Sequence, residues 1–386
     1  MGPVEELDDR EGLTPEPGTF VKVDANRVRL LRDGRQAFPA MLEAISAAKS
    51  EILFEMYWFQ GDRAGHMFRD ALTAKAREGV GVRVSYDAVG SIGLPSSLWA
   101  PLIEAGGQVY EFGPLAPFTV RFRLGKLNFR DHRKVLVVDA KTAFTGGMNI
   151  GDQWLTREDG GEDWRDDAIE VRGPAAEDLR TLFFETWRRT GRVIPRDVGR
   201  LSRKVSGRVM VLTNTHGRQR GIRHAYLTGI RSAKSRIDIC NPYFLPGPIF
   251  LSALYAAQKR GVEVRILIPG LSDVWVVSMA MSSLIGRLLE AKARVFAYQR
   301  RVLHAKTAIF DETLTTTGTY NLDPRSRRYN RECNIAVYDR HFARESRGSF
   351  ERDLDDAVEC SLSSWKERSL GHRFLAWFAY PLRQFL

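Results

Sequence analysis

Two stretches of this sequence carry the same polar residues at the same spacing. The first holds His132, Lys134, Asp139, Gly146 and Asn149, and the second holds His304, Lys306, Asp311, Gly318 and Asn321. Each residue of the first set is separated from its counterpart by 172 positions. A single His-x-Lys arises by chance in many chains, but a second one followed by the same Asp, Gly and Asn does not. The repeat therefore limits the fold to two equivalent halves, and it predicts one active centre with two histidines.

Similarity beyond the two motifs indicates how each half folds. Residues 44–59 and 229–244 both have the pattern of an amphipathic helix, a short Ala-Lys-Ser turn and an apolar strand. A second helix follows in both halves and ends near Gly79 or Gly261, residues suited to a helix C-cap, and another apolar strand comes next. This succession predicts an α/β fold in which each half is a mixed, mostly parallel sheet flanked by helices.

Composition suggests where the halves begin and end. We expect the N-terminal half at residues 20–195 and the C-terminal half at 205–365, joined across a basic stretch with Gly and Pro near 191–207. Residues 1–19 are acidic and have neither the basic region nor the apolar region of a signal peptide, so we expect a flexible N-terminus. Residues 366–386 form an apolar tail between arginines, too short to span a bilayer. The tail is either a helix in the membrane interface or a final helix packed on the core.

The charge of the chain favours anionic partners. There are 58 Lys and Arg against 47 Asp and Glu, a net charge of +11. Nucleic acid, phospholipid headgroups and phosphorylated substrates all fit this charge, as does a basic surface that only meets solvent. Cys240, Cys333 and Cys360 form no disulfide framework and no zinc pattern, so we expect buried thiols and a reducing compartment.

A basic and aromatic segment runs directly into the first histidine. Residues 118–130 alternate cations, among them Arg121, Arg123 and Arg130, with Phe and Leu. We interpret these arginines as ligands of an anionic headgroup, with the apolar side chains touching lipid; a basic loop packed on the domain is the alternative. The matching segment of the second half, residues 274–289, is apolar and predicted to be helical, and a buried core helix is the rival interpretation.

The spacing of each motif predicts a hairpin. His132 and Lys134 are two residues apart on a predicted strand, so their side chains share one face. The strand ends at Asp139, and a return strand brings Asn149 back beside them. Asp311 has the same place in the second half. Each aspartate lies at a turn, seven residues after its histidine, and this odd spacing puts it on the other face of the strand. We therefore interpret both aspartates as structural.

Histidine, lysine and asparagine together favour phosphoryl chemistry. Lysine repels metal ions and no carboxylate cluster accompanies the histidines, so we expect no metal and no cofactor. The lysines and asparagines can hold phosphate oxygens. A neutral histidine can attack phosphorus, and a protonated one can donate to the leaving alcohol. A carboxylate would orient each imidazole: Glu332 in the second half and, when Ile335 is aligned with Ile169, Asp166 in the first.

At this point the sequence resembles the phospholipase D superfamily. The resemblance rests on His-x-Lys-x4-Asp followed by Gly-x-x-Asn, present twice, and covers roughly residues 20–365. Residues 128–134 with 146–152, and residues 321–326 with the stretch that follows, look like the cardiolipin synthase branch. Tyr57 and Tyr243 fall at strand-end motifs of that branch, and Gly147 and Thr319 stand where many members carry Ser. We expect all four to contact substrate.

The resemblance implies a fold and a reaction. It implies two halves related by pseudo-twofold symmetry, with one site at their interface, no metal and a phospho-histidine intermediate. For cardiolipin synthases it implies that one phosphatidylglycerol gives its phosphatidyl group to the enzyme and a second accepts it, releasing glycerol. The pair of spanning helices familiar at the N-terminus of this branch is absent from the sequence, so we expect a shorter, peripheral variant at the cytoplasmic face of the membrane.

Other functions remain compatible with the sequence. A hydrolase of the same superfamily would cut phospholipid or nucleic acid, although the interleaved apolar residues argue against nucleic acid as the partner. A non-catalytic binding protein with relic motifs is disfavoured because both half-sites are intact. We assign His132 as the nucleophile and His304 as the acid, a choice that the symmetry leaves nearly even. The sequence defines no oligomeric state.

Overall fold

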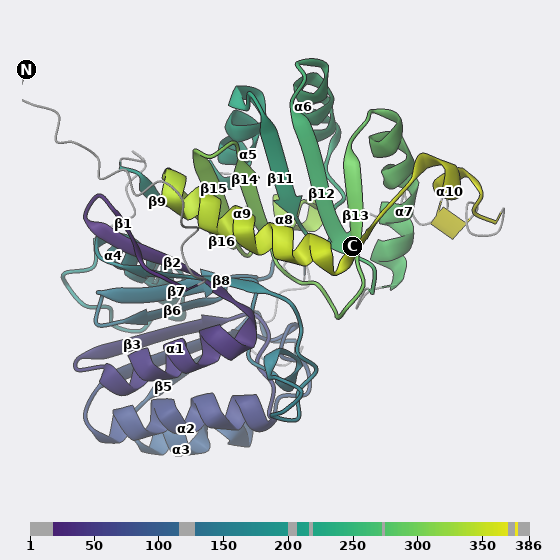
Figure 1. The fold of residues 1–386 in the computed structure, drawn as a ribbon. Helices are drawn as coiled ribbons and strands as arrows, with labels where there is room; N and C mark the ends of the chain where they lie inside the picture. The colour runs from purple at the N-terminus through teal and green to yellow at the C-terminus, as the bar shows by residue number, and fades with distance from the viewer. Residues whose placement is uncertain are drawn as a thin grey trace, which may run out of the picture.

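The chain folds into two α/β halves that lie against each other, as the ribbon in Figure 1 shows. The computed structural model describes residues 18–115, 128–199, 207–215, 219–271, 275–369 and 375–376. Residues 1–17 of the expected flexible N-terminus, Arg121, Arg123 and most of the apolar tail lie outside these residues.

The N-terminal half is built on one sheet of eight strands in the order β1-β2-β8-β7-β6-β3-β4-β5. Its elements in chain order are β1 (Val21–Val23), β2 (Asn26–Arg32), α1 (Asp33–Ala47), β3 (Glu51–Met56), α2 (Arg63–Arg77), β4 (Gly81–Asp87), the 3₁₀ turn η1 (Ser96–Trp99), α3 (Ala100–Glu104), β5 (Gln108–Phe112), β6 (Val135–Val138), β7 (Thr142–Gly146), the 3₁₀ turn η3 (Asp152–Trp154), β8 (Asp167–Arg172), α4 (Pro174–Trp187) and the 3₁₀ turn η4 (Arg188–Thr190).

The C-terminal half is built on a sheet of nine strands in the order β10-β9-β16-β15-β14-β11-β12-β13-β17. Its elements are β9 (Val209–Thr215), β10 (Gln219–Arg220), α5 (Gly221–Ser232), β11 (Arg236–Cys240), α6 (Pro248–Lys259), β12 (Glu263–Pro269), α7 (Trp275–Glu290), β13 (Arg294–Tyr298), β14 (Thr307–Phe310), β15 (Leu314–Gly318), α8 (Pro324–Arg328), β16 (Glu332–Val337), α9 (Arg340–Asp355), β17 (Ala357–Glu359) and α10 (Leu362–Lys366).

The strand orders confirm the internal duplication. The run β2-β8-β7-β6-β3-β4-β5 of the first sheet matches β9-β16-β15-β14-β11-β12-β13 of the second, position for position. The predicted hairpins are also confirmed, because β6 pairs antiparallel with β7 and β14 with β15. The short strands β1, β10 and β17 extend the sheets at their edges and differ between the halves.

The mixed α/β class is confirmed, but the expected predominance of parallel pairs is wrong. Only β3, β4 and β5 in the first sheet, and β11, β12 and β13 in the second, are parallel neighbours. The other neighbours are antiparallel. The reason is the hairpin itself. Each motif strand, β6 or β14, is followed by a partner that runs in the opposite direction, and the next strand, β8 or β16, reverses direction again.

Local signals fix the ends of the second helix in each half. Asp62 caps α2, because its carboxylate accepts a hydrogen bond from the backbone N–H of Gly65 at 3.0 Å. Beyond α2 and α6, Gly79 and Gly261 have φ angles of +88° and +87°. This left-handed conformation suits glycine and confirms both residues at the helix C-termini.

The two halves share a core where they meet. Helix α4 covers the face of the first sheet that turns toward the second half, and one apolar cluster there joins Leu179 and Phe183 of α4 to Ile335 of β16 and Phe342 of α9. In Figure 1 the long helix α9 runs across the second sheet above the first. Helix α7 belongs to the core of the second half, so the described part of the apolar segment, residues 275–289, fits the core-helix interpretation.

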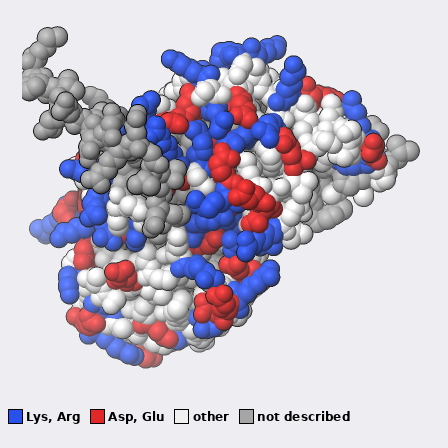
Figure 2. Space-filling model, viewed as in Figure 1, with Lys and Arg blue, Asp and Glu red and all other residues white. Residues whose placement is uncertain are grey.

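Charge is distributed over both halves. Figure 2 shows Lys and Arg side chains across one face of the molecule, with Asp and Glu side chains between them. Several arginines at the surface are paired, for example Arg294 with Glu359 at 2.8 Å and Arg35 with Glu158 at 3.0 Å. On this face the excess of positive charge is therefore interrupted by acidic groups.

Candidate active site

The two His-x-Lys motifs meet where the halves contact each other. The backbone N–H of His132 donates to the carbonyl oxygen of Arg331 at 3.0 Å, and that of His304 donates to the carbonyl oxygen of Arg165 at 2.7 Å. A parallel β-bridge accompanies each of these bonds. The segment that leads into His132 therefore pairs with the segment just before β16, and the segment that leads into His304 pairs with the segment just before β8. This pairing brings both half-sites together at the contact between the halves, which we call the seam.

Each imidazole is held by a carboxylate from the other half. His132 Nδ1 lies 3.0 Å from Glu332 Oε2, and His304 Nδ1 lies 2.7 Å from Asp166 Oδ2. Both carboxylates are fully buried and both histidines nearly so. The arrangement joins the motifs into one site, because the carboxylate at each Nδ1 comes from the opposite half.

The sequence identified both carboxylates but not this exchange. β7 pairs with β8 at Thr145 and Ile169, and β15 pairs with β16 at Thr317 and Ile335. The two isoleucines are therefore equivalent, as the sequence alignment assumed. Which histidine each carboxylate serves depends on how the halves dock, and no local spacing carries that information.

Two lysines are buried beside the histidines. Lys134 Nζ donates to the carbonyl oxygen of His132 at 2.8 Å and lies 4.9 Å from the ring centre of Tyr57. Lys306 Nζ donates to the carbonyl oxygen of His304. Burial lowers the pKa of Lys134 to about 7, and the nearby Lys306 ammonium lowers it in the same direction. Two buried cations near each other make the site favourable for an anion.

The two motif asparagines are buried at the ends of β7 and β15. Asn149 Oδ1 accepts a hydrogen bond from the backbone N–H of Trp58 at 3.1 Å, which fixes the orientation of its amide. Asn321 Oδ1 has no hydrogen-bond partner among the described residues, although Asn321 is only 3% exposed. A buried polar atom of this kind is commonly satisfied by a ligand.

Aromatic rings enclose both imidazoles. The Tyr57 ring centre lies 4.6 Å from that of His132, and the Tyr243 ring centre lies 6.4 Å from that of His304, both with edge-to-face geometry. Trp154 and Trp164 also approach His304, at 5.7 and 6.0 Å. The sequence pointed to the tyrosines but missed the tryptophans. The sequence did offer one signal for the tryptophans, because both lie between two predicted site residues, Asn149 and Asp166.

Gly147 and Thr319 support the carboxylates. A Cβ on Gly147 would lie 2.1 Å from Asp166 Oδ1 and 2.8 Å from the carbonyl oxygen of His304, so the carboxylate occupies the space of a side chain. The hydroxyl of Thr319 donates to Glu332 Oε2. The sequence predicts that both residues contact substrate. Their observed contacts favour a role in positioning the carboxylates.

Arg130 lies in a buried ion pair. Its Nε donates to Asp87 Oδ1 at 3.0 Å, and its Nη2 donates to the carbonyl oxygens of Phe112 and Gly113. The side chain is only 1% exposed. These contacts favour a structural role for Arg130 over the headgroup binding suggested by the basic segment.

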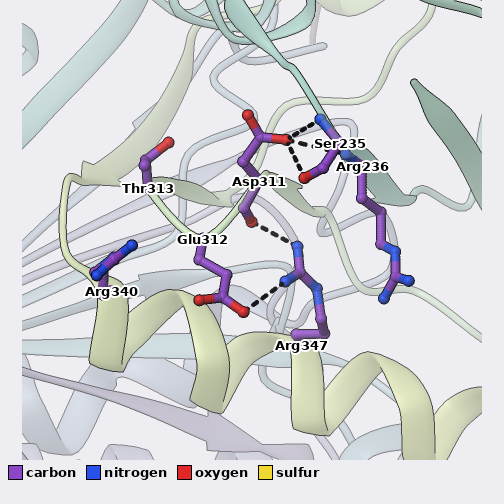
Figure 3. Close-up of a pocket in the computed structure, with 7 residues that line it drawn as sticks. All are labelled: Ser235, Arg236, Asp311, Glu312, Thr313, Arg340 and Arg347. Carbon is purple, nitrogen blue, oxygen red and sulfur yellow. Dashed lines mark hydrogen bonds and ion pairs between the residues drawn. The ribbon is translucent and has the colours of Figure 1, made fainter. Parts of the chain in front are cut away.

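The two motif aspartates hold turns away from the histidines. Asp139 accepts hydrogen bonds from the backbone N–H groups of residues 49–51, and Asp311 accepts them from those of residues 234–236. Figure 3 shows Asp311 bound to Ser235 and Arg236. These residues line a cavity of about 430 Å³. Asp311 follows β14 while His304 precedes it, so this cavity is at the far end of the strand. The geometry agrees with a structural role for both aspartates.

None of the helices that the structure describes is both long and apolar enough to cross a bilayer.

Comparison with known proteins identifies the class and then the family. A profile described as "Cardiolipin synthase, PLD-like domain" matches residues 41–162 and 226–354. The chain is 37% identical over 358 residues to the major cardiolipin synthase ClsA of Bacillus subtilis strain 168, covering 91% of this chain and 73% of that one. It is 34% identical over 367 residues to cardiolipin synthase 1 of Bacillus cereus, covering 92% and 72%.

A solved structure shares the fold. The phosphatidylserine synthase of Haemophilus influenzae superimposes with a TM-score of 0.72 over 93% of this chain and 95% of its own, at 14% identity. Two α/β halves with paired His-x-Lys motifs at their seam define a phospholipase D-like protein. Within that class, the chain belongs to the cardiolipin synthase family.

Proposed function

We propose that this protein is a phosphatidyltransferase that condenses two phosphatidylglycerols to cardiolipin and glycerol through a phospho-histidine. The observation that carries the proposal is the seam, where two imidazoles are each held at Nδ1 by a carboxylate of the opposite half. The names of the relatives, which span most of the chain, support the same reaction. With Nδ1 engaged, Nε2 is the nitrogen of each ring that carries the chemistry.

His132 fits the nucleophile. Burial and the nearby Lys134 ammonium lower the pKa of His132 well below its usual value, so the ring is neutral at physiological pH. The pKa of Glu332 is raised by burial to about 7, so the carboxylate beside His132 is less able to hold an imidazolium. A neutral imidazole has the lone pair that attack on phosphorus requires.

His304 fits the acid and base. Burial alone would raise the pKa of its partner Asp166, but His304 and Lys306 outweigh burial and lower it. An ionised carboxylate at 2.7 Å stabilises the protonated form of the ring. The two histidines therefore have environments that separate their roles.

The transfer then proceeds in two steps. His132 forms an N–P bond as the P–O bond to glycerol breaks, and His304 gives its proton to the departing oxygen. The hydroxyl of a second phosphatidylglycerol next gives its proton to His304 and forms a new P–O bond, while the N–P bond breaks and its electron pair returns to His132. Lys134 and Lys306 stabilise the negative charge on the phosphate oxygens in both steps.

The product of the purified protein tests this function. Incubation with phosphatidylglycerol vesicles, followed by mass spectrometry of the lipids, should give cardiolipin and glycerol in equal amounts. Phosphatidic acid without cardiolipin would reject the synthase assignment in favour of hydrolysis. His304→Ala serves as the matched inactive protein and should give neither product.

Trapping the intermediate tests the assignment of the nucleophile. With labelled phosphatidylglycerol and a rapid acid-free quench, the label should map to a peptide that contains His132. The same label on a peptide with His304 would reverse the roles.

We further propose that the edge of the sheets that carries the site rests on the membrane surface. Strands β3, β4 and β5 are parallel, so their carboxyl ends lie at the same edge of the sheet. Tyr57 follows β3 at this edge, and Ile92 and Leu115 follow β4 and β5 there. Ile249 and Leu271 follow β11 and β12 in the second half. These four apolar side chains are between 37% and 71% exposed. Apolar groups around the entrance to a lipid-processing site favour insertion among headgroups.

Vesicle binding tests this surface with a matched control. Ile92→Asp combined with Ile249→Asp should weaken co-sedimentation with phosphatidylglycerol vesicles by about tenfold or more, because two charges would enter the interface. Val193 is 88% exposed but lies beside Gln108, at the opposite end of β5. Val193→Asp should bind as the unchanged protein does. Equal binding by both variants would reject the assigned surface.

A further inference from the structure

The two carboxylates of the site are held by donors other than the histidines. Trp154 Nε1 donates to Asp166 Oδ2 at 3.0 Å, and Ser326 Oγ donates to Glu332 Oε1 at 2.7 Å. Trp154 and Ser326 are separated by 172 positions, the same offset that relates the histidines. The duplicated half-sites therefore have a further equivalent position, filled by chemically unrelated side chains that both bond the carboxylate of their own half.

Trp154 is built into the first half so that its indole reaches this carboxylate. The 3₁₀ turn η3 ends at Trp154, whose side chain is 1% exposed. Asp166 Oδ2 receives both the indole N–H and the His304 Nδ1 contact at 2.7 Å. A change at Trp154 must therefore alter the oxygen that orients His304.

The second half holds its carboxylate with more donors. Glu332 accepts hydrogen bonds from Thr319, from Ser326 and, at 3.3 Å, from Asn330. The first half has Gly147 at the position of Thr319 and so has no hydroxyl there. Besides Trp154, Asp166 accepts from the backbone N–H of Asp167 at 2.8 Å, which gives it two donors against three for Glu332. Loss of one donor should consequently matter more for Asp166 than for Glu332.

We propose that positions 154 and 326 are the equivalent positioning residues of the two half-sites, and that Trp154 tunes His304 through Asp166. The indole N–H fixes the carboxylate in place and draws charge from the oxygen that faces the imidazole. In this role Trp154 acts through Asp166, although its ring centre also lies 5.7 Å from that of His304. The inference rests on the proposed phosphatidyl transfer.

Replacement of Trp154 by Phe removes the N–H and keeps an aromatic ring. We expect Trp154→Phe to lower kcat about tenfold with KM unchanged, since a hydrogen bond to a charged group is lost from the reacting enzyme. Without the N–H, Asp166 holds the His304 proton more strongly. The alkaline limb of kcat, measured at saturating phosphatidylglycerol, should therefore shift to higher pH.

Trp99 supplies the matched control. It is buried in the same apolar cluster as Trp154, packs against Phe59 and Tyr86, and its Nε1 has no hydrogen-bond partner among the described residues. Trp99→Phe makes the same change of ring and N–H and should keep kcat within about twofold and the pH limb in place. Equal effects of the two variants on kcat and on the pH limb would reduce Trp154 to a packing role and overturn the proposal.

Ser326→Ala tests the equivalence. We expect about a threefold loss of kcat, because Thr319 and Asn330 remain bonded to Glu332. A loss as large as that of Trp154→Phe would contradict the greater support in the second half. If the unchanged protein makes no cardiolipin, the proposed function fails; if it does and Trp154→Phe matches it in kcat and pH profile, only this inference fails.

Discussion

Gly147 offers the sharpest test of how the site is assembled. A Cβ at this position would meet Asp166 Oδ1 at 2.1 Å, whereas ordinary contact begins at about 3.4 Å. Gly147→Ala therefore requires the carboxylate to move by roughly 1.3 Å, the difference of the two distances. The backbone is less able to give way, because Gly147 N–H is bonded to the carbonyl oxygen of Asp167 at 3.0 Å.

A shift of this size is enough to break the bond between Asp166 and His304. That bond is 2.7 Å long, and contacts beyond about 3.5 Å no longer count as hydrogen bonds. A hydrogen bond to a charged group contributes about 1.5–3 kcal/mol. Since each 1.36 kcal/mol corresponds to a factor of ten in rate, Gly147→Ala should lower kcat roughly 10- to 150-fold.

The assay is cardiolipin formation under saturating phosphatidylglycerol, with thermal unfolding measured alongside. Gly199→Ala is the control, because a Cβ at Gly199 meets no atom of the described residues within 4 Å. It should keep both kcat and melting temperature. A fully active, normally folded Gly147→Ala protein would refute the reasoning, since Asp166 would then not need its observed place.

Four further predictions concern the histidines, two limbs of the pH dependence and the turns. His132→Ala and His304→Ala should each lower cardiolipin formation roughly 10³-fold or more, because both act in one reaction; half activity in each would indicate two separate sites. kcat/KM should fall above about pH 7 as Lys134, whose pKa is about 7, loses its proton, and Lys134→Arg should move this limb upward. kcat/KM should also fall below about pH 7 as Glu332, with its pKa raised to about 7, gains a proton and stops accepting from His132; Glu332→Gln should abolish this limb. Asp139→Ala should lower the free energy of unfolding by about 1–2 kcal/mol with kcat nearly unchanged, and a loss of kcat at constant stability would contradict a structural role.

Local periodicity was enough to predict much of the architecture. The alternation of His132 and Lys134, with the turn at Asp139, predicts the hairpin that β6 and β7 form. Gly79 and Gly261 marked true helix ends. The predominance of parallel strands was wrong because β2 and β8 return antiparallel, and their order in the sheet is not a local property.

The site was harder to predict where contacts cross between distant segments. Both carboxylates could be found by alignment, but their exchange depends on docking of the halves. Arg130 looked like a ligand of a headgroup because its partner Asp87 is 43 residues away in sequence. Thr319 looked like a phosphate ligand because nothing in the sequence tells that its hydroxyl faces Glu332.

The exchange of carboxylates has a consequence for the history of the chain. After a gene duplication, two copies of a self-sufficient unit are free to drift, and one usually decays. Here the loss of Asp166 from one copy removes the carboxylate that holds His304 in the other, and Glu332 and His132 have the reverse dependence, so in the proposed mechanism each copy needs the other. Selection therefore acts on both copies through either one, which keeps two complete motifs in place while the residues around them, such as Trp154 and Ser326, diverge.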